Sequence, residues 1–187
     1  MRHFSLETTR LTLREIVEGD IDFVAEMLSD PDVMRFYPKR LSRDESMEWI
    51  AKQRMRYERD GHGLWLASER ESGEPVGQIG LCMQDIADWE PRRNAEIGYL
   101  LHRAYWGRGF ATEAATCVRQ YAFDTLAYDH VISLIRPENE PSQAVARRLG
   151  MTIQGTTTAF HVWPHLVFGI ARHPVRDAET QSIQERS

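Results

Sequence analysis

Two glycines, Gly107 and Gly109, stand one residue apart, directly before a run of alanines with helical spacing. Glycine has no Cβ and tolerates positive φ, so such a turn lets the backbone pass close to a bulky anion. The first amides of the helix, from Gly107 to Thr112, would have no partner within it, and the helix dipole adds about half a positive charge there. The pattern predicts a phosphate site, although a plain tight connection has the same sequence pattern.

A single carboxylate, that of Glu96, interrupts the apolar run of residues 95–101. Burial or a position in a cleft would raise the pKa of this carboxyl toward the range of a useful general base. The alternative is a glutamate at the edge of a sheet, paired with Arg92 or Arg93. The residues alone leave both interpretations open.

Asn139, Pro141 and Ser142 crowd the start of a short helical pattern. Residues of these types cap helices, and capping is the role that the sequence itself predicts for them.

The histidines and cysteines show no spacing typical of a metal site. His161 and His165 are four residues apart, but Pro164 between them breaks any helix that would bring them to one face. Cys82 and Cys117 form no C-x-x-C pair and have no neighbours that suggest an activated thiolate. We expect no metal and no thiol nucleophile. The third glycine of a dinucleotide-binding turn and the lysine of a P-loop are also missing.

The elements that must position these residues can be read from hydrophobic spacing. Seven strands are expected, at residues 9–16, 64–69, 75–83, 95–101, 131–135, 151–155 and 165–171. Helices are expected from Asp20 to Asp30, from the capping box of Ser42 and Glu45 to about Asp60, from Gly109 onward, and over residues 143–149. Because a helix joins the strand of Glu96 to the next strand, those two strands should run parallel.

Size and composition indicate one globular domain over residues 1–173, followed by a polar tail at 174–187 that we expect to be disordered. The chain has 187 residues, 42% hydrophobic and 27% charged, and a net charge of -5. An acidic chain argues against a nucleic-acid surface, and no apolar run is long enough to span a membrane. Since the N-terminus lacks the apolar core of a secretory signal, we expect a cytoplasmic protein.

The glycine turn also resembles a known motif. The run from Trp106 to Ala111 is similar to the acetyl-CoA pyrophosphate loop of the GNAT superfamily of N-acetyltransferases, (Gln/Arg)-x-x-Gly-x-(Gly/Ala). Gly109 and Ala111 match this pattern, whereas Trp106 departs from its first position. The longer string from Glu96 to Ala114 resembles the branch that acetylates N-terminal alanines of ribosomal proteins, where an aromatic residue before the glycine is ordinary.

The likeness covers nearly all of residues 9–172 and implies a fold of the α/β (α+β) class. In such a domain a mixed, mostly antiparallel sheet of six to seven strands carries helices on both faces. Its central parallel pair splays apart, and the pantetheine arm of the cofactor enters the gap. Family members commonly dimerise, so a homodimer is an expectation of the same kind.

The resemblance also implies roles for individual residues. Glu96 would remove a proton from the amine, and the Leu101 amide would polarise the thioester carbonyl. Asn139 would bond the pantetheine arm. The position where the family commonly places a tyrosine, as acid for the leaving thiolate, falls on Ala146, so Ser142 becomes the substitute acid as well as a cofactor contact. The pyrophosphate would be bound by the residues of the turn, namely Trp106, Gly107, Arg108, Gly109, Phe110, Ala111 and Thr112.

The function implied is direct transfer of acetyl from acetyl-CoA to a primary amine, with both substrates bound together. The expected acceptor is a protein N-terminal α-amine. The alternatives are a small amine (a polyamine, an antibiotic or an amino acid) and a CoA-binding module without catalysis, which the alanine at position 146 keeps open. Phe36, Tyr37, Trp163 and the loop of residues 158–164 are candidates for the wall of the acceptor site, or else ordinary hydrophobic cover.

Overall fold

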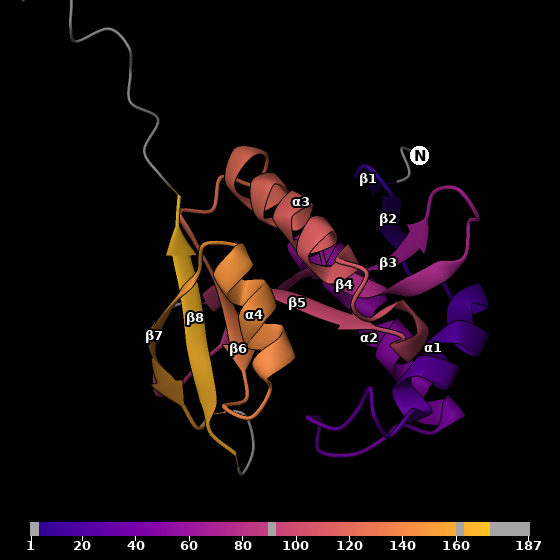
Figure 1. Cartoon of the computed structure of the whole chain (residues 1–187), viewed down its shortest axis with the longest axis horizontal. Coiled ribbons are helices and arrows are strands. Elements are labelled where there is room, and N and C mark those ends of the chain that lie inside the picture. Colours follow the sequence, from indigo (N-terminus) through magenta and orange to yellow (C-terminus); the bar gives the residue numbers. More distant parts are fainter. Residues whose placement is uncertain (1–3, 90–92, 160–162, 173–187) are drawn as a thin grey trace, which may run out of the picture.

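Eight strands form one mixed sheet in the order β1-β2-β3-β4-β5-β6-β8-β7 (Figure 1). The computed structural model describes residues 4–89, 93–159 and 163–172. The strands are β1 (Ser5–Glu7), β2 (Leu11–Glu15), β3 (Leu64–Glu69), β4 (Pro75–Asp85), β5 (Arg93–Leu101), β6 (His130–Ile135), β7 (Thr152–Thr157) and β8 (His165–Ala171). All neighbouring pairs are antiparallel except β5 and β6.

Four α-helices accompany the sheet in the described part of the chain, with short 3₁₀ turns at Glu18–Asp20 and Arg103–Tyr105. They are α1 (Ile21–Ser29), α2 (Arg43–Asp60), α3 (Phe110–Asp124) and α4 (Glu140–Arg148). The capping box that predicts the start of α2 is present, since Ser42 accepts from the Glu45 amide and Glu45 from the Ser42 amide. None of the described helices combines the length and apolar character that crossing a bilayer requires.

The expected fold class is confirmed, but the sheet has eight strands rather than the expected six to seven, and the other differences lie at the ends of elements. The extra strand, β1, has only three residues, too few to show a period of two. Strands β4 and β5 extend beyond the expected 75–83 and 95–101, because they pair from Gly77–Leu101 to Asp85–Arg93. Helix α4 begins at Glu140 rather than Gln143, and β7 runs on to Thr157. The expected disordered tail, 174–187, lies outside the described residues.

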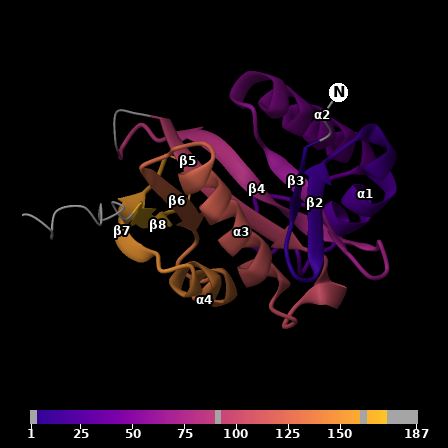
Figure 2. The same cartoon turned by 90° about the horizontal axis from the view of Figure 1, so that it is seen from above.

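Helices cover both faces of the sheet (Figure 2). On β3, Trp65 and Ala67 pack in the core cluster beneath α3, whereas Leu66 between them packs with α1 and α2. Side chains alternate between faces along a strand, so neighbouring residues of one strand belong to two separate cores. The same alternation on β5 decides which of its side chains face α1 and α2 and which face α3.

Strands β5 and β6 separate after a single register pair, Glu96 with Ile132. Figure 1 shows the result: β6, β8 and β7 turn away from the direction of β4 and β5. Just past this pair the Ser133 hydroxyl donates to the Ile97 carbonyl at 2.8 Å, in place of a ladder bond. The splayed central parallel pair implied by the family resemblance is therefore present.

The N-terminal end of α3 is fastened to β2 and the turn before it through Glu113. Its carboxylate accepts from the Thr8 hydroxyl at 2.6 Å, the Arg10 amide at 2.8 Å and the Arg10 Nε at 2.7 Å. Although partial burial opposes it, this set of donors holds the pKa of Glu113 below its ordinary value. The first turn of the helix is thus fixed in place.

Gly80 allows β4 to approach the chain before β3 more closely than any side chain would permit. A Cβ at this position would lie 2.1 Å from the Gly63 carbonyl oxygen, which is backbone and cannot rotate away. We expect Gly80→Ala to lower the free energy of unfolding in urea by about 3 kcal/mol. Gly19→Ala is the matched control because nothing lies within 4 Å of that Cβ. Equal stability of the two variants would contradict this account.

Candidate active site

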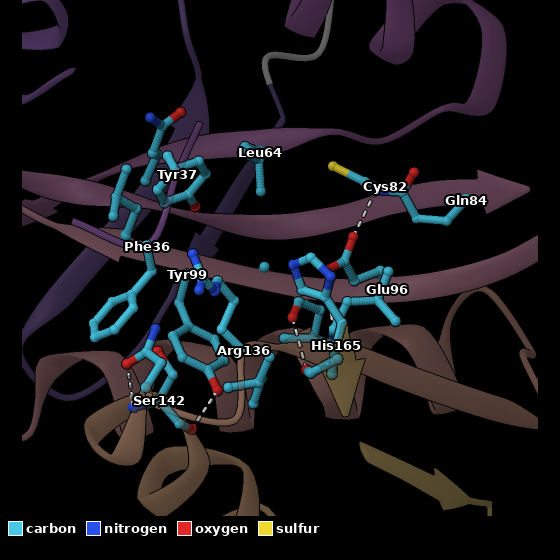
Figure 3. A pocket seen from close by; sticks show the side chains of 18 of the residues that line it. Phe36, Tyr37, Leu64, Cys82, Gln84, Glu96, Tyr99, Arg136, Ser142 and His165 are labelled. Carbon is cyan, nitrogen blue, oxygen red and sulfur yellow. Dashed lines mark hydrogen bonds between the residues drawn. The ribbon is translucent and has the colours of Figure 1, made fainter. Parts of the chain in front are cut away.

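A cavity of about 270 Å³ lies where β5 and β6 part (Figure 3). Both faces of the sheet contribute to its lining. The sheet supplies Gln84 from β4, Glu96 from β5 and His165 from β8, and Arg136 directly follows β6. Helix α2 supplies Arg56, the segment after α1 supplies Tyr37, and the α4 side supplies Asn139 and Ser142. The cavity therefore passes through the gap and joins the two faces.

Glu96 is the one carboxylate among the described residues that line this cavity. Its Oε2 accepts from the Gln84 amide at 2.6 Å and its Oε1 from the Leu134 backbone N–H at 3.3 Å. Burial raises the pKa of Glu96 above its ordinary value, and these hydrogen bonds and the charge of Arg56 only partly offset that effect. Glu96 is therefore a carboxylate that takes up a proton more readily than an exposed glutamate does.

The alternative pairing of Glu96 with Arg93 is wrong. Arg93 pairs instead with Asp60 at 3.1 Å and with Asp85 at 3.7 Å, on the surface. Arg92 lies outside the described residues. Glu96 is not at a sheet edge either, because β5 has β4 on one side and β6 on the other.

Tyr99, which the sequence analysis did not select, brings a phenol to the other side of the gap. Its hydroxyl donates to the Ser142 backbone carbonyl at 2.7 Å, as Figure 3 shows. Burial raises its pKa, so the phenol keeps its proton at neutral pH. The signal that could have selected Tyr99 is the alternation of side chains along β5. Leu100 packs with α1 and α2, whereas Tyr99 beside it packs with α3, on the other face of the sheet.

Asn139 and Ser142 lie at the start of α4, as expected for capping residues. The Asn139 Oδ1 accepts from the Ser142 amide at 3.2 Å. Both residues also line the cavity, so capping and a ligand contact are compatible at these positions. The Ser142 hydroxyl has no hydrogen bond to any described residue, whereas Ala146, one turn further, is fully buried.

The glycine turn has the backbone geometry that the sequence predicts. Gly107 has φ +74° and Gly109 has φ +81°, and Gly109 is the N-cap of α3. The Glu113 amide donates to the Gly109 carbonyl at 3.1 Å, so the amides before it, up to Thr112, precede the helical ladder. Ala111 and Thr112 are half-buried and Phe110 is fully buried, so the turn presents backbone rather than side chains.

Two guanidinium groups flank this turn. Arg108 pairs with Glu69 at 2.9 Å and lies over the rings of Tyr105 and Phe110. The guanidinium of Arg10 also lies over the Phe110 ring, 4.6 Å from its centroid. The Arg10 Nη1 donates to the Arg108 carbonyl at 3.0 Å. The Arg108 side chain is therefore committed to Glu69, and what the turn itself offers an anion is its backbone amides.

The side of β5 that faces the gap ends at Leu101, next to Trp106. The His102 amide bonds the Val76 carbonyl on β4, so the peptide groups of Leu101 point the other way, toward the gap. The Leu101 carbonyl accepts from the Trp106 indole at 2.9 Å. Trp106 is thus a support for this edge, and the Leu101 amide is directed as a ligand contact would require.

The expected acceptor wall is only partly described. Phe36, Tyr37 and Trp163 line the cavity, and Tyr37 and Trp163 are 38% and 36% exposed. Residues 160–162 of the expected loop lie outside the described residues. Cys82 also lines the cavity, but burial raises its pKa to about 12, so this thiol is not a nucleophile.

Comparison with known proteins places this geometry in a family. The model of the acetyltransferase (GNAT) domain matches residues 10–152. The chain is 34% identical over 147 residues to the uncharacterized protein YkkB of Bacillus subtilis, covering 78% of this chain and 84% of that one. It is 26% identical to the spermidine N(1)-acetyltransferase of Escherichia coli, covering 76% and 73%. The crystal structure of an acetyltransferase from Agrobacterium tumefaciens has a TM-score of 0.78 and 29% identity, covering 92% and 96%.

The two glutamates of the site should titrate in opposite directions from the ordinary glutamate value of about 4.3. Burial raises the pKa of Glu96, whereas the donors around Glu113 lower its pKa. Carbon-13 shifts of the side-chain carboxyls, followed by NMR from pH 3 to 8 and assigned with Glu96→Gln and Glu113→Gln, should show Glu96 protonating first as the pH falls. A Glu96 midpoint at or below that of Glu113 would overturn this description.

Proposed function

The chain belongs to the GNAT acetyltransferase family and is an acetyl-CoA-dependent N-acetyltransferase, and on that premise we propose that its acceptor is the N-terminal α-amine of a peptide or protein. The observation that supports this acceptor is the charge and opening of the cavity. Its described lining holds one carboxylate, Glu96, against Arg56 and Arg136. Tyr37 and Trp163, which also line it, are partly exposed.

The small volume supports the same acceptor. Small-molecule sites typically occupy about 300–1,000 Å³, and this cavity of about 270 Å³ must also hold the thioester end of the cofactor. It has room for one terminal residue. The rest of a peptide would then continue outward past Tyr37 and Trp163, whose apolar rings suit contact with a chain.

A polyamine suits this site less well, although a spermidine acetyltransferase is among the relatives. A polyamine carries several positive charges, so its site gains from several carboxylates. Here Arg56, which has no carboxylate partner among the described residues, lines the same cavity and would repel a second ammonium group. A peptide terminus brings one ammonium group only, which Glu96 can receive.

In the proposed reaction acetyl-CoA supplies the activated acyl group and the chain positions it. The amides from Gly107 to Thr112 bind the pyrophosphate, and Asn139 with the open edge of β5 binds the arm. Glu96 accepts the proton that the ammonium must lose before its nitrogen can attack. The Leu101 amide donates to the thioester oxygen as negative charge develops there.

The proton for the departing sulfur comes from the hydroxyls on the α4 side of the gap. We assign this role to Tyr99 ahead of Ser142, because a phenol is a stronger acid than an aliphatic alcohol. The Tyr99 hydroxyl is anchored on the Ser142 carbonyl, so the two residues move as one unit. The phenol that the family commonly has on α4 is thus replaced by one from β5.

Release of CoA with a panel of peptides beginning with alanine, serine or methionine, beside spermidine and free amino acids, tests the acceptor. We expect peptides to be used best, and Glu96→Gln to lower kcat/KM by about 10²- to 10⁴-fold. Because only ionised Glu96 can accept a proton and its pKa is raised, the rate should fall with decreasing pH sooner than an ordinary carboxylate would predict. Faster acetylation of spermidine than of any peptide would refute the proposed acceptor.

Gly109→Ala should weaken binding of acetyl-CoA, because alanine resists the left-handed conformation that Gly109 adopts at φ +81°. We expect about a tenfold higher Kd by calorimetry, equivalent to about 1.4 kcal/mol. Gly73→Ala is the matched control: Gly73 has φ +75° and lies in the loop between β3 and β4. Nothing lies within 4 Å of a Cβ there, and a Cβ at Gly109 would meet only the Arg10 guanidinium, at an ordinary contact distance of 3.5 Å. If both variants bind alike, the turn does not hold the pyrophosphate.

A further inference from the structure

One arginine of the cavity has no carboxylate partner among the described residues. Arg56 on α2 is half-buried, and its hydrogen bond is to a neutral group, the Gln53 Oε1 at 3.1 Å. Its neighbours on the same helix differ, since Arg54 pairs with Glu18 and Arg59 with Asp60. A guanidinium that lines a cavity beside a neutral acceptor is a binding site for an anion.

The position of Arg56 is fixed by the core. Gln53 is fully buried, and its Oε1 also accepts from the Leu64 amide at 3.2 Å. The guanidinium therefore bonds to an acceptor that is itself held between α2 and β3. Little side-chain entropy remains to be lost when a ligand binds, which favours recognition by this residue over a free surface arginine.

Arg56 faces the acceptor half of the cavity. Cys82 and Glu96 are register partners on β4 and β5, and burial raises the pKa of both, an effect that the positive charge of Arg56 partly opposes. Arg56 forms no ion pair with Glu96, and both side chains line the same cavity. The cofactor turn, by contrast, is at the start of α3, on the opposite face of the sheet.

The other arginine of the cavity is already balanced. Arg136 lies 3.3 Å from Glu138 and stacks at 4.5 Å on the ring of Trp163. Its Nε makes no hydrogen bond to a described residue, but its charge has a carboxylate neighbour and its planar face lies over a ring. Arg56 is therefore the group whose charge an acceptor can satisfy.

We propose that Arg56 binds a carboxylate of the acceptor, so that the preferred acceptor is an amine with an acidic group close to the reacting nitrogen. This inference rests on the proposed α-amine acceptor and narrows it. Two sources offer the same chemistry: an acidic side chain next to the N-terminus of a peptide, and the α-carboxylate of a free amino acid. A planar guanidinium forms two parallel hydrogen bonds with either.

Matched peptides separate charge from shape. Peptides beginning Ala-Asp and Ala-Glu are compared with Ala-Asn and Ala-Gln, which have nearly the same size, and free alanine with alaninamide. We expect kcat/KM to be about tenfold higher for each acid than for its amide. In Arg56→Gln this ratio should fall to about one, and in Arg56→Glu a peptide beginning Ala-Lys should become the better substrate.

The quantity to follow is the ratio of kcat/KM for the acid to kcat/KM for its amide. Any effect of Arg56 on the pKa of Glu96 acts on both substrates alike and cancels in this ratio. Arg54→Gln, on the same helix but outside the cavity, should keep the ratio of the unchanged protein. Thermal unfolding of each variant verifies its fold, and the ratio in the unchanged protein tests the preference without any substitution.

The outcomes distinguish the two proposals. Peptides acetylated equally well with acid and amide would overturn the role of Arg56 and leave the peptide acceptor standing. Acetylation of free alanine but of no peptide, with the ratio still dependent on Arg56, would overturn the peptide acceptor and support the carboxylate site. Preference for spermidine would overturn both.

Discussion

The parting of β5 and β6 is the constraint on which the site depends. A sheet interior ordinarily satisfies every peptide group through neighbouring strands, and an unpaired group away from water costs free energy. Here the pairing stops after Glu96 and Ile132, and two side chains take over part of the ladder. Ser133 donates to the Ile97 carbonyl and Trp106 to the Leu101 carbonyl. The stretch between them, centred on Tyr99, is left facing the gap, so the fold itself supplies an extended edge that a ligand with amide groups can pair with.

Because side chains alternate along β5, Glu96 and Tyr99 lie on opposite faces of the sheet. Glu96 lies on the face covered by α2, with Cys82 and Gln84, whereas Tyr99 lies on the face covered by α3 and reaches the start of α4. The residues that we propose as proton acceptor and proton donor come from one strand, three residues apart, on opposite faces of the sheet. Burial raises the pKa of each, which keeps Tyr99 protonated and lets Glu96 exchange a proton. Neither residue needs to move for the gap between them to be the place of reaction.

The parts of this arrangement that could be predicted from the sequence are local. The turn at Gly107 and Gly109 follows from conformational freedom within a few residues, and the box of Ser42 and Glu45 fixes the start of α2. The carboxylate of Glu96 was visible as a polar residue in an apolar strand, and the crossover predicted the parallel pair. Strand ends were less predictable, because β4 and β5 extend only as far as their mutual pairing allows.

Arg56 shows why the acceptor half was not readable in the same way. As a residue of a strongly charged helix it is indistinguishable in sequence from Arg54 or Arg59, and only the packing of α2 turns it inward. What selects it is the buried amide of Gln53, which also bonds the backbone of β3. In our proposals, cofactor binding uses backbone geometry, which short motifs encode, whereas acceptor choice uses side chains that distant elements bring together. A chain of this fold can therefore change its acceptor by altering the face of α2 while its cofactor site remains the same.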